Sequence, residues 1–141
     1  AKGDLQEAEK VFRQSLTLHR KVLPEGHVNL SHPLSGLGQV LLEEGDVVAA
    51  EPLLREALDL RLHALGKTHW RTAEVQATLG RCMLAQQNFS AAEQYFLQSY
   101  TTFKEHYPER TASKQKALQG IVSLYEKWGR TNEAEKYRKK R

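Results

Sequence analysis

The sequence predicts an all-α solenoid of antiparallel helix pairs, with about seven helices. A fixed step of 42 residues joins four alanines, each followed by a glutamate: Ala8, Ala50, Ala92 and Ala134. Each period also contains two segments whose apolar residues recur at spacings of three and four, which is the pattern of one helix face. Units of this kind bury a continuous core only when they stack on one another. We therefore expect a repeat array that acts as a binding scaffold.

The helix pair that begins at residue 31 shows the pattern most clearly. The shorter helix is predicted over residues 31–44 and ends at Gly45, because glycine suits the left-handed position that closes many helices. Asp46 is expected to cap the longer helix, which is predicted over residues 47–65. Pro52 is tolerated near the start of this helix, where a missing N–H costs little.

The later periods repeat this layout. Helices are predicted over residues 73–86 and 89–106, with Asn88 in the turn between them. Another helix is expected over residues 109–128, and a short last helix starts at Thr131. These segments make two full pairs and a final pair whose second member is short.

The first helix is expected to stand alone. The 42-residue step places Gly3 at the turn position of Gly45 and Gly129, with Gln87 at the remaining place, so the chain should open in a turn. We expect a fragment of a longer array that forms one domain over residues 1–141. Its parts are the second helix of a truncated repeat (1–30), two repeats (31–72 and 73–114) and a C-terminal capping repeat (115–141).

A missing neighbour should leave part of the first helix bare. Val11, Phe12, Ser15 and Leu16 would contact helices on both sides in a longer array. With one side uncovered, we expect self-association through this N-terminal helix.

The charge distribution argues against nucleic acid as a partner. The formal net charge is +4, but five positive charges lie within the last six residues, and the rest of the chain carries a net charge of −1. A phosphate-binding domain would spread its cations along a face of the fold. We read the basic terminus instead as a polar cap on the last repeat, centred on Arg138.

Composition indicates a soluble, cytoplasmic protein. Hydrophobic residues make up 40% and charged residues 27% of the chain, which is ordinary for globular proteins. No apolar run approaches the roughly 20 residues that a membrane helix needs, so no membrane association is expected. The single cysteine, Cys82, cannot form an internal disulfide, and a buried position is the default for it.

The register resembles the tetratricopeptide repeat. Leu34, Leu37-Gly38 and Leu41, followed by Ala50 and Leu54, occupy the offsets at which that family places its large and small packing residues. The period of 42 rather than 34 is similar to the long repeats of kinesin light chains and many bacterial proteins. The resemblance implies a right-handed superhelix that binds proteins or peptides.

The family also suggests where a partner would bind. Its shorter helices line a concave groove, and the positions that match are His32, Ser35, Gln39, Glu43, Glu74, Arg81, Lys116, Gln119, Ser123 and Lys127. Gln39 can form hydrogen bonds with a peptide backbone, Arg81 can bind a carboxylate through two hydrogen bonds, and Lys116 adds positive charge. We expect a protein or peptide partner that bears acidic groups.

Three positions depart from the family pattern. Gln76 replaces a large apolar residue, Val122 a small one and Arg138 an aromatic one. We therefore expect less regular packing in the third and fourth units.

No pattern of catalytic or metal-binding residues accompanies the repeat. Gly36-Leu37-Gly38 lacks the third glycine and the preceding strand of a dinucleotide site, so a helix-packing role is favoured. His27 and His69 occupy equivalent loop positions, where they should brace the loop or start a helix. We expect no enzymatic activity, no cofactor and no metal.

A second functional class stays open. The stretch from Leu124 to Arg130 resembles C-terminal repeat regions that are appended to bacterial serine/threonine kinases. The alternative is therefore a regulatory or targeting region of a multidomain signalling enzyme whose catalytic domain lies outside these residues.

Overall fold

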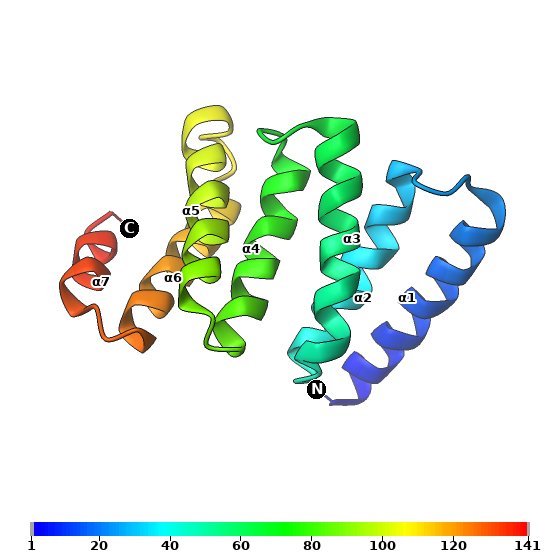
Figure 1. Ribbon diagram of the computed structural model, residues 1–141, viewed down its shortest axis with the longest axis horizontal. Coiled ribbons are helices and arrows are strands. Elements are labelled where there is room, and N and C mark those ends of the chain that lie inside the picture. The colour runs from blue at the N-terminus through cyan, green and yellow to red at the C-terminus, as the bar shows by residue number, and fades with distance from the viewer. Residues whose placement is uncertain (1, 141) are drawn as a thin grey trace. The chain divides into compact units, whose positions relative to one another are not determined.

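The computed structural model describes residues 2–140, which contain seven α-helices, one short 3₁₀ segment and no strand (Figure 1). The elements are α1 (Lys2–Val22), η1 (Val28–Leu30), α2 (Ser31–Glu43), α3 (Val47–Leu65), α4 (Trp70–Ala85), α5 (Phe89–His106), α6 (Thr111–Lys127) and α7 (Thr131–Arg138). The prediction of an all-α fold with about seven helices is confirmed. The chain forms two compact units, residues 1–66 and residues 67–141.

The first unit contains α1, η1, α2 and α3. Helix α2 packs against both α1 and α3. Its apolar stripe, with Leu34, Leu37 and Leu41, is buried together with Ala50 and Leu54 of α3. The spacing of three and four residues therefore marks the buried face of α2, as predicted.

Two glycines of α2 allow its neighbours to approach closely. A Cβ atom at Gly38 would lie 2.7 Å from the Leu54 side chain, and one at Gly36 would overlap the Phe12 ring. Gly38 therefore allows the close approach of α3, and Gly36 allows that of α1. The predicted helix-packing role of this short motif is confirmed.

The second unit contains α4 to α7. Helix α5 packs against α4 and α6, helix α6 also contacts α4, and α7 packs on α6. Phe96 of α5 is fully buried and serves both sides, since a Cβ atom at Gly80 of α4 or at Gly120 of α6 would overlap its ring. One aromatic side chain therefore fills the space that two glycines leave open.

The turns between paired helices follow the 42-residue step. Gly45 and Gly129 adopt φ angles of +90° and +78°, and Gln87 takes the same left-handed region with φ +60°. Asp46 and Asn88 then cap the next helices by accepting the amide protons of Ala49 and Ala91 at 3.2 and 3.3 Å. Glycine adopts this backbone conformation without strain, whereas glutamine does so at a cost.

The two equivalent histidines begin helical segments. The Nδ1 atom of His27 accepts the amide proton of Asn29 at 3.0 Å, and Nδ1 of His69 accepts that of Arg71 at 3.1 Å. Each ring satisfies an amide that has no carbonyl partner in the first turn. The predicted helix-starting role is confirmed for both.

Two expectations near helix starts are wrong. Gly3 and Asp4 lie inside α1 rather than in a turn, and Asp4 complements the positive end of the helix dipole in the first turn. Helix α4 begins at Trp70, three residues before the predicted start, because the His69 cap lies ahead of the first apolar residue of the stripe.

The bare face of α1 also differs in part from the expectation. Phe12 packs on α2 and Leu16 is buried, so neither is free. The large apolar side chains that α1 leaves exposed are Val11 (51%), Leu18 (59%) and Val22 (68%). Self-association through α1 remains a prediction, and these three residues would carry it.

Candidate functional site

The predicted binding residues of the first unit follow one face of α2. His32, Ser35, Gln39 and Glu43 are spaced by three and four residues, which places them above one another on a helix. His32, Gln39 and Glu43 are exposed, and the Gln39 amide donates to the Glu43 carboxylate at 3.4 Å. This face offers a polar amide and one negative charge to a partner.

Ser35 has a structural role in addition. Arg61 of α3 is buried, with 6% of its surface exposed, and its guanidinium donates to Ser31 Oγ at 3.0 Å and to Ser35 Oγ at 3.2 Å. A buried cation is costly unless it is well hydrogen-bonded. Ser35 therefore holds α2 to α3, and only part of its hydroxyl capacity is left for a ligand.

The predicted residues of the second unit lie on α4 and α6, which pack against each other. Glu74 and Arg81 are exposed on α4. On α6 the spacing of three and four residues joins Lys116, Gln119, Ser123 and Lys127, of which only Ser123 is partly buried. The six side chains thus occupy two helices that are in direct contact.

This pair of helices presents unpaired positive charge. Arg81, Lys116 and Lys127 form no ion pair or side-chain hydrogen bond with any residue in the range 2–140. Glu74 is the single acidic residue among the six predicted positions of the unit. Three free cations on adjacent helices suit a ligand with carboxylate groups.

An aromatic cluster supports the end of α6. Trp128 stacks on Phe89 with a centroid distance of 5.6 Å and on Tyr125 at 6.3 Å, while the Arg130 guanidinium lies 3.6 Å from the Trp128 ring centroid. The cluster joins the end of α6 to the start of α5 and fixes the turn that precedes α7. It is a packing feature that positions Lys127 on the rigid end of its helix.

The departures from the family pattern have different outcomes. Val122 is buried in the core. Arg138 forms ion pairs on the surface with Glu126 at 3.2 Å and Glu135 at 2.9 Å. Gln76 is buried with an unpaired amide oxygen. Less regular packing of these units remains a prediction, and the departure at Gln76 leaves one buried polar atom without a partner in the range 2–140.

A family model described as a tetratricopeptide repeat matches residues 1–63 and, in a second placement, residues 31–105. The chain belongs to this family. Tetratricopeptide repeats form protein-interaction scaffolds, and the two matches overlap as expected for consecutive repeats in one register. The predicted family is therefore confirmed.

Two solved structures share the fold. BtubC (BKLC) from P. vanneervenii is 16% identical, with a TM-score of 0.84 over 96% of this chain and 54% of that one. A putative kinesin light chain from Podosopora anserina, with nearly identical TPR-like repeats, is 20% identical, with a TM-score of 0.84 over 96% of this chain and 64% of that one. This tetratricopeptide-repeat chain thus spans between half and two thirds of these structures. Among curated proteins, none matches the sequence.

Other candidate chemistry is limited in this tetratricopeptide-repeat chain. Across the described residues, no three His, Cys, Asp or Glu side chains gather as metal ligands, and no helix combines the length and apolarity needed to cross a membrane. Cys82 is fully buried on α4, as its sequence position predicted. The predicted binding residues, on α2 in the first unit and on α4 and α6 in the second, remain candidates.

The sequence missed Arg61. It lies one helical turn after Ala57 and Leu58 on the buried face of α3, and nothing in the local pattern indicates a buried cation. The only signal was the pair of serines one helical turn apart on α2, whose hydroxyl oxygens accept hydrogen bonds from the Arg61 guanidinium.

Proposed function

We propose that this tetratricopeptide-repeat chain binds an acidic protein or peptide segment through the exposed faces of its shorter helices. The observation that carries the proposal is the set of three unpaired cations on the adjacent helices α4 and α6. The family supports the choice of a protein partner rather than a small substrate.

The side chains suit different parts of such a segment. Arg81 presents a planar guanidinium that can bind a carboxylate through two hydrogen bonds, whereas Lys116 and Lys127 act as point charges. Gln119 can donate to and accept from a peptide backbone, and Gln39 offers the same groups separately on the first unit. Charge would set the register of the bound segment, and the amides would hold its main chain.

Selection from a library of short random peptides tests the proposal. Peptides that bind should be enriched in Asp and Glu, and calorimetry should show that Arg81→Glu and Lys116→Glu weaken them by about tenfold or more, a loss of about 1.4 kcal/mol or greater. Lys104→Glu is the matched control, because Lys104 is exposed on α5 in the same unit. Equal affinities for Arg81→Glu, Gln39→Ala and the parent protein would reject the groove.

The alternative role, a regulatory or targeting region of a multidomain signalling enzyme, would use the same face. In that case the acidic segment would belong to the enzyme or its substrate. Self-association through α1 is a separate prediction, which sedimentation of Leu18→Lys against the parent protein tests.

A further inference from the structure

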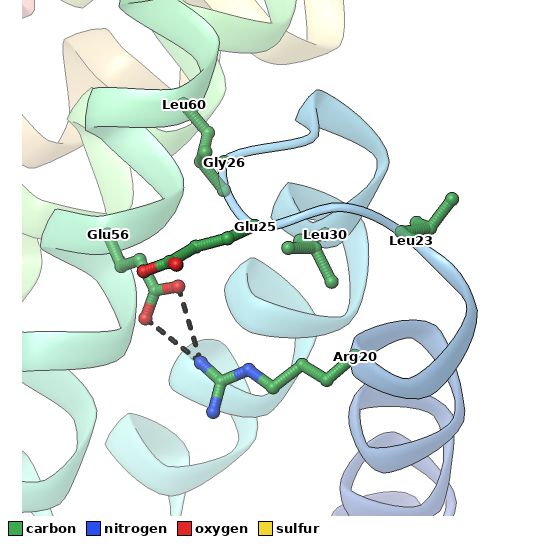
Figure 2. A pocket seen from close by; sticks show the side chains of 7 residues that line it. All are labelled: Arg20, Leu23, Glu25, Gly26, Leu30, Glu56 and Leu60. Carbon is green, nitrogen blue, oxygen red and sulfur yellow. Dashed lines mark hydrogen bonds and ion pairs between the residues drawn. The ribbon is translucent and has the colours of Figure 1, made fainter.

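The first unit contains a pocket on a surface that the proposed function does not use. It has a volume of about 670 Å³ and lies between the end of α1, the following loop and α3 (Figure 2). Leu23, Leu30 and Leu60 supply apolar surface, and Arg20, Glu25 and Glu56 supply charge. A volume of this size holds a large side chain with its flanking backbone.

The charges of the pocket do not balance. One nitrogen of the Arg20 guanidinium lies 3.1 and 3.2 Å from the two oxygens of Glu56. Glu25 has no ion-pair partner among residues 2–140, and Figure 2 shows its side chain directed toward Glu56. The pocket therefore holds two carboxylates and one guanidinium, which leaves it with a net charge of −1 beside the apolar side chains.

The repeat architecture does not require this chemistry. The 42-residue step carries Arg20 to Leu62, Glu25 to Lys67 and Glu56 to Gln98, so the charged set is lost in the next repeat. Positions that serve the fold, such as the alanines of the step, do not change in this way. The surrounding unit is also acidic, since residues 1–66 carry ten acidic and seven basic side chains.

We infer that this pocket binds a lysine or arginine side chain of an extended segment from a protein partner. The aliphatic stem lies on Leu23, Leu30 and Leu60, where it loses contact with water, and the cationic head pairs with Glu25 and with the remaining lone pairs of the Glu56 oxygens. Neighbouring aliphatic residues of the segment cover the rest of the floor. This site takes a basic group and lies in the first unit, whereas the proposed acidic segment binds chiefly on α4 and α6.

Peptide titration followed by amide NMR tests the inference. The probe is acetyl-Leu-Lys-Leu-amide, added to the full ¹⁵N-labelled chain, with acetyl-Leu-Glu-Leu-amide as the comparison. The lysine peptide should shift the amide signals of Gly26, Leu30 and Leu60 in a saturable way. The glutamate peptide should leave these signals unchanged.

Substitution of either carboxylate should weaken binding of the lysine peptide, whereas substitution of the arginine should strengthen it. Glu25→Gln and Glu56→Gln should each weaken the lysine peptide by about threefold or more, because each removes an acceptor for the cation. Arg20→Gln should strengthen it, since Glu56 then loses its internal partner. Glu105→Gln, at an exposed position of α5 in the other unit, is the matched control and should leave the affinity for the lysine peptide unchanged.

Three results would overturn the inference. The first is no shift at the pocket amides with the lysine peptide. The second is an undiminished affinity in the Glu25→Gln, Glu56→Gln double variant whose spectrum shows a folded chain. The third is binding of the glutamate peptide that Arg20→Gln abolishes, which would make the occupant an anion. None of these readouts depends on Arg81 or Lys116, so the proposed function can fail or hold independently.

Discussion

The hydroxyl of Tyr125 donates a 2.7 Å hydrogen bond to the carboxylate of Glu93, which links α6 to α5. Glu93 is one of the four glutamates that follow the alanines of the 42-residue step. The other three have basic partners on their own helices instead: Arg13 for Glu9 at 2.8 Å, Arg55 for Glu51 at 2.7 Å and Arg138 for Glu135 at 2.9 Å. The glutamates of the step therefore serve the fold rather than a ligand.

Tyr125→Phe should destabilise the second unit. Burial, followed by the hydrogen bond to Glu93, raises the pKa of Tyr125 well above its usual value, so the phenol stays protonated and donates across the neutral range. Removing the hydroxyl leaves the partly buried Glu93 carboxylate without this donor, and we expect a loss of about 1–3 kcal/mol in the free energy of unfolding. Urea denaturation followed by circular dichroism measures it.

Glu93→Gln is the informative companion to that variant. Its amide oxygen can still accept the proton of Tyr125, so this variant should lose less stability than Tyr125→Phe. Equal stability of Tyr125→Phe and the parent protein would show that the bond contributes nothing.

Gln87→Gly should stabilise the turn between α4 and α5. Gln87 adopts φ +60°, the left-handed region that its equivalents Gly45 and Gly129 occupy without strain. Relief of the strain outweighs the greater freedom of glycine in the unfolded chain, so we expect a gain of about 0.5–1 kcal/mol. Gly45→Gln is the converse and should cost a similar amount, which thermal denaturation of both variants measures. A loss of stability in Gln87→Gly would contradict this account.

Gln76→Leu should also raise stability. Gln76 is only 5% exposed; its amide nitrogen donates to Gln98 Oε1 at 3.2 Å, but its own Oε1 has no partner in the part of the chain that the structure describes. Leucine stands at the equivalent positions 34 and 118. Replacing a half-satisfied buried amide by leucine should add about 1–2 kcal/mol to the free energy of unfolding.

Gln98→Ala provides the opposite change at the same contact. It removes the acceptor of the Gln76 amide nitrogen, so the urea midpoint should fall while that of Gln76→Leu rises. A decrease for Gln76→Leu would instead show that the amide contributes to packing that leucine cannot replace.

The sequence predicted most of the fold because the repeat places one kind of constraint at fixed intervals. Gly45 and Asp46 mark a helix end and the next helix start through local backbone chemistry, and the structure shows both roles. The α3 bounds match the predicted residues 47–65 for the same reason. The start of α4 was missed because the His69 cap acts before the apolar stripe begins.

The candidate binding surfaces were less predictable, because they depend on residues far apart in the chain. Arg20 and Glu56 are 36 positions apart, and nothing in either helix alone indicates that they meet at a pocket. Ser35 was predicted only as a ligand contact, since helical spacing cannot show that Arg61 of the next helix uses its hydroxyl. Periodicity identifies which face is buried, but it does not identify which polar groups pair across it.

The pKa values of the Glu9 and Glu44 carboxyl groups are shifted in opposite directions. Loss of solvent around its carboxyl, followed by the hydrogen bond with Glu9, raises the pKa of Glu44 above 4.5. The hydrogen bond from Arg13, followed by that with Glu44, lowers the pKa of Glu9 below the same value. The Arg13 guanidinium thus favours the ionised form of Glu9, whereas the surroundings of Glu44 favour its protonated form.

The contribution of Glu44 to the stability of the first unit should therefore decline as the pH rises from 4.5 through the raised pKa. Above the ordinary value of 4.5 the unfolded chain has lost the Glu44 proton while the folded chain still holds it. This contribution is complete at lower pH and is lost as the pH rises through the raised pKa. The Glu9 contribution has the opposite sign, because it is present above 4.5 and is lost as the pH falls through the lowered pKa.

Glu44→Gln tests this assignment. The variant cannot ionise, so it should be more stable than the parent protein at pH 7, and it should lack the part of the pH dependence that lies above 4.5. Urea midpoints measured at several pH values give both quantities. Glu7→Gln, at an exposed position of α1, is the control and should follow the curve of the parent protein. Parallel curves for Glu44→Gln and the parent protein would mean that the pKa of Glu44 is not raised in the folded chain, and the pH dependence would then have to come from other groups.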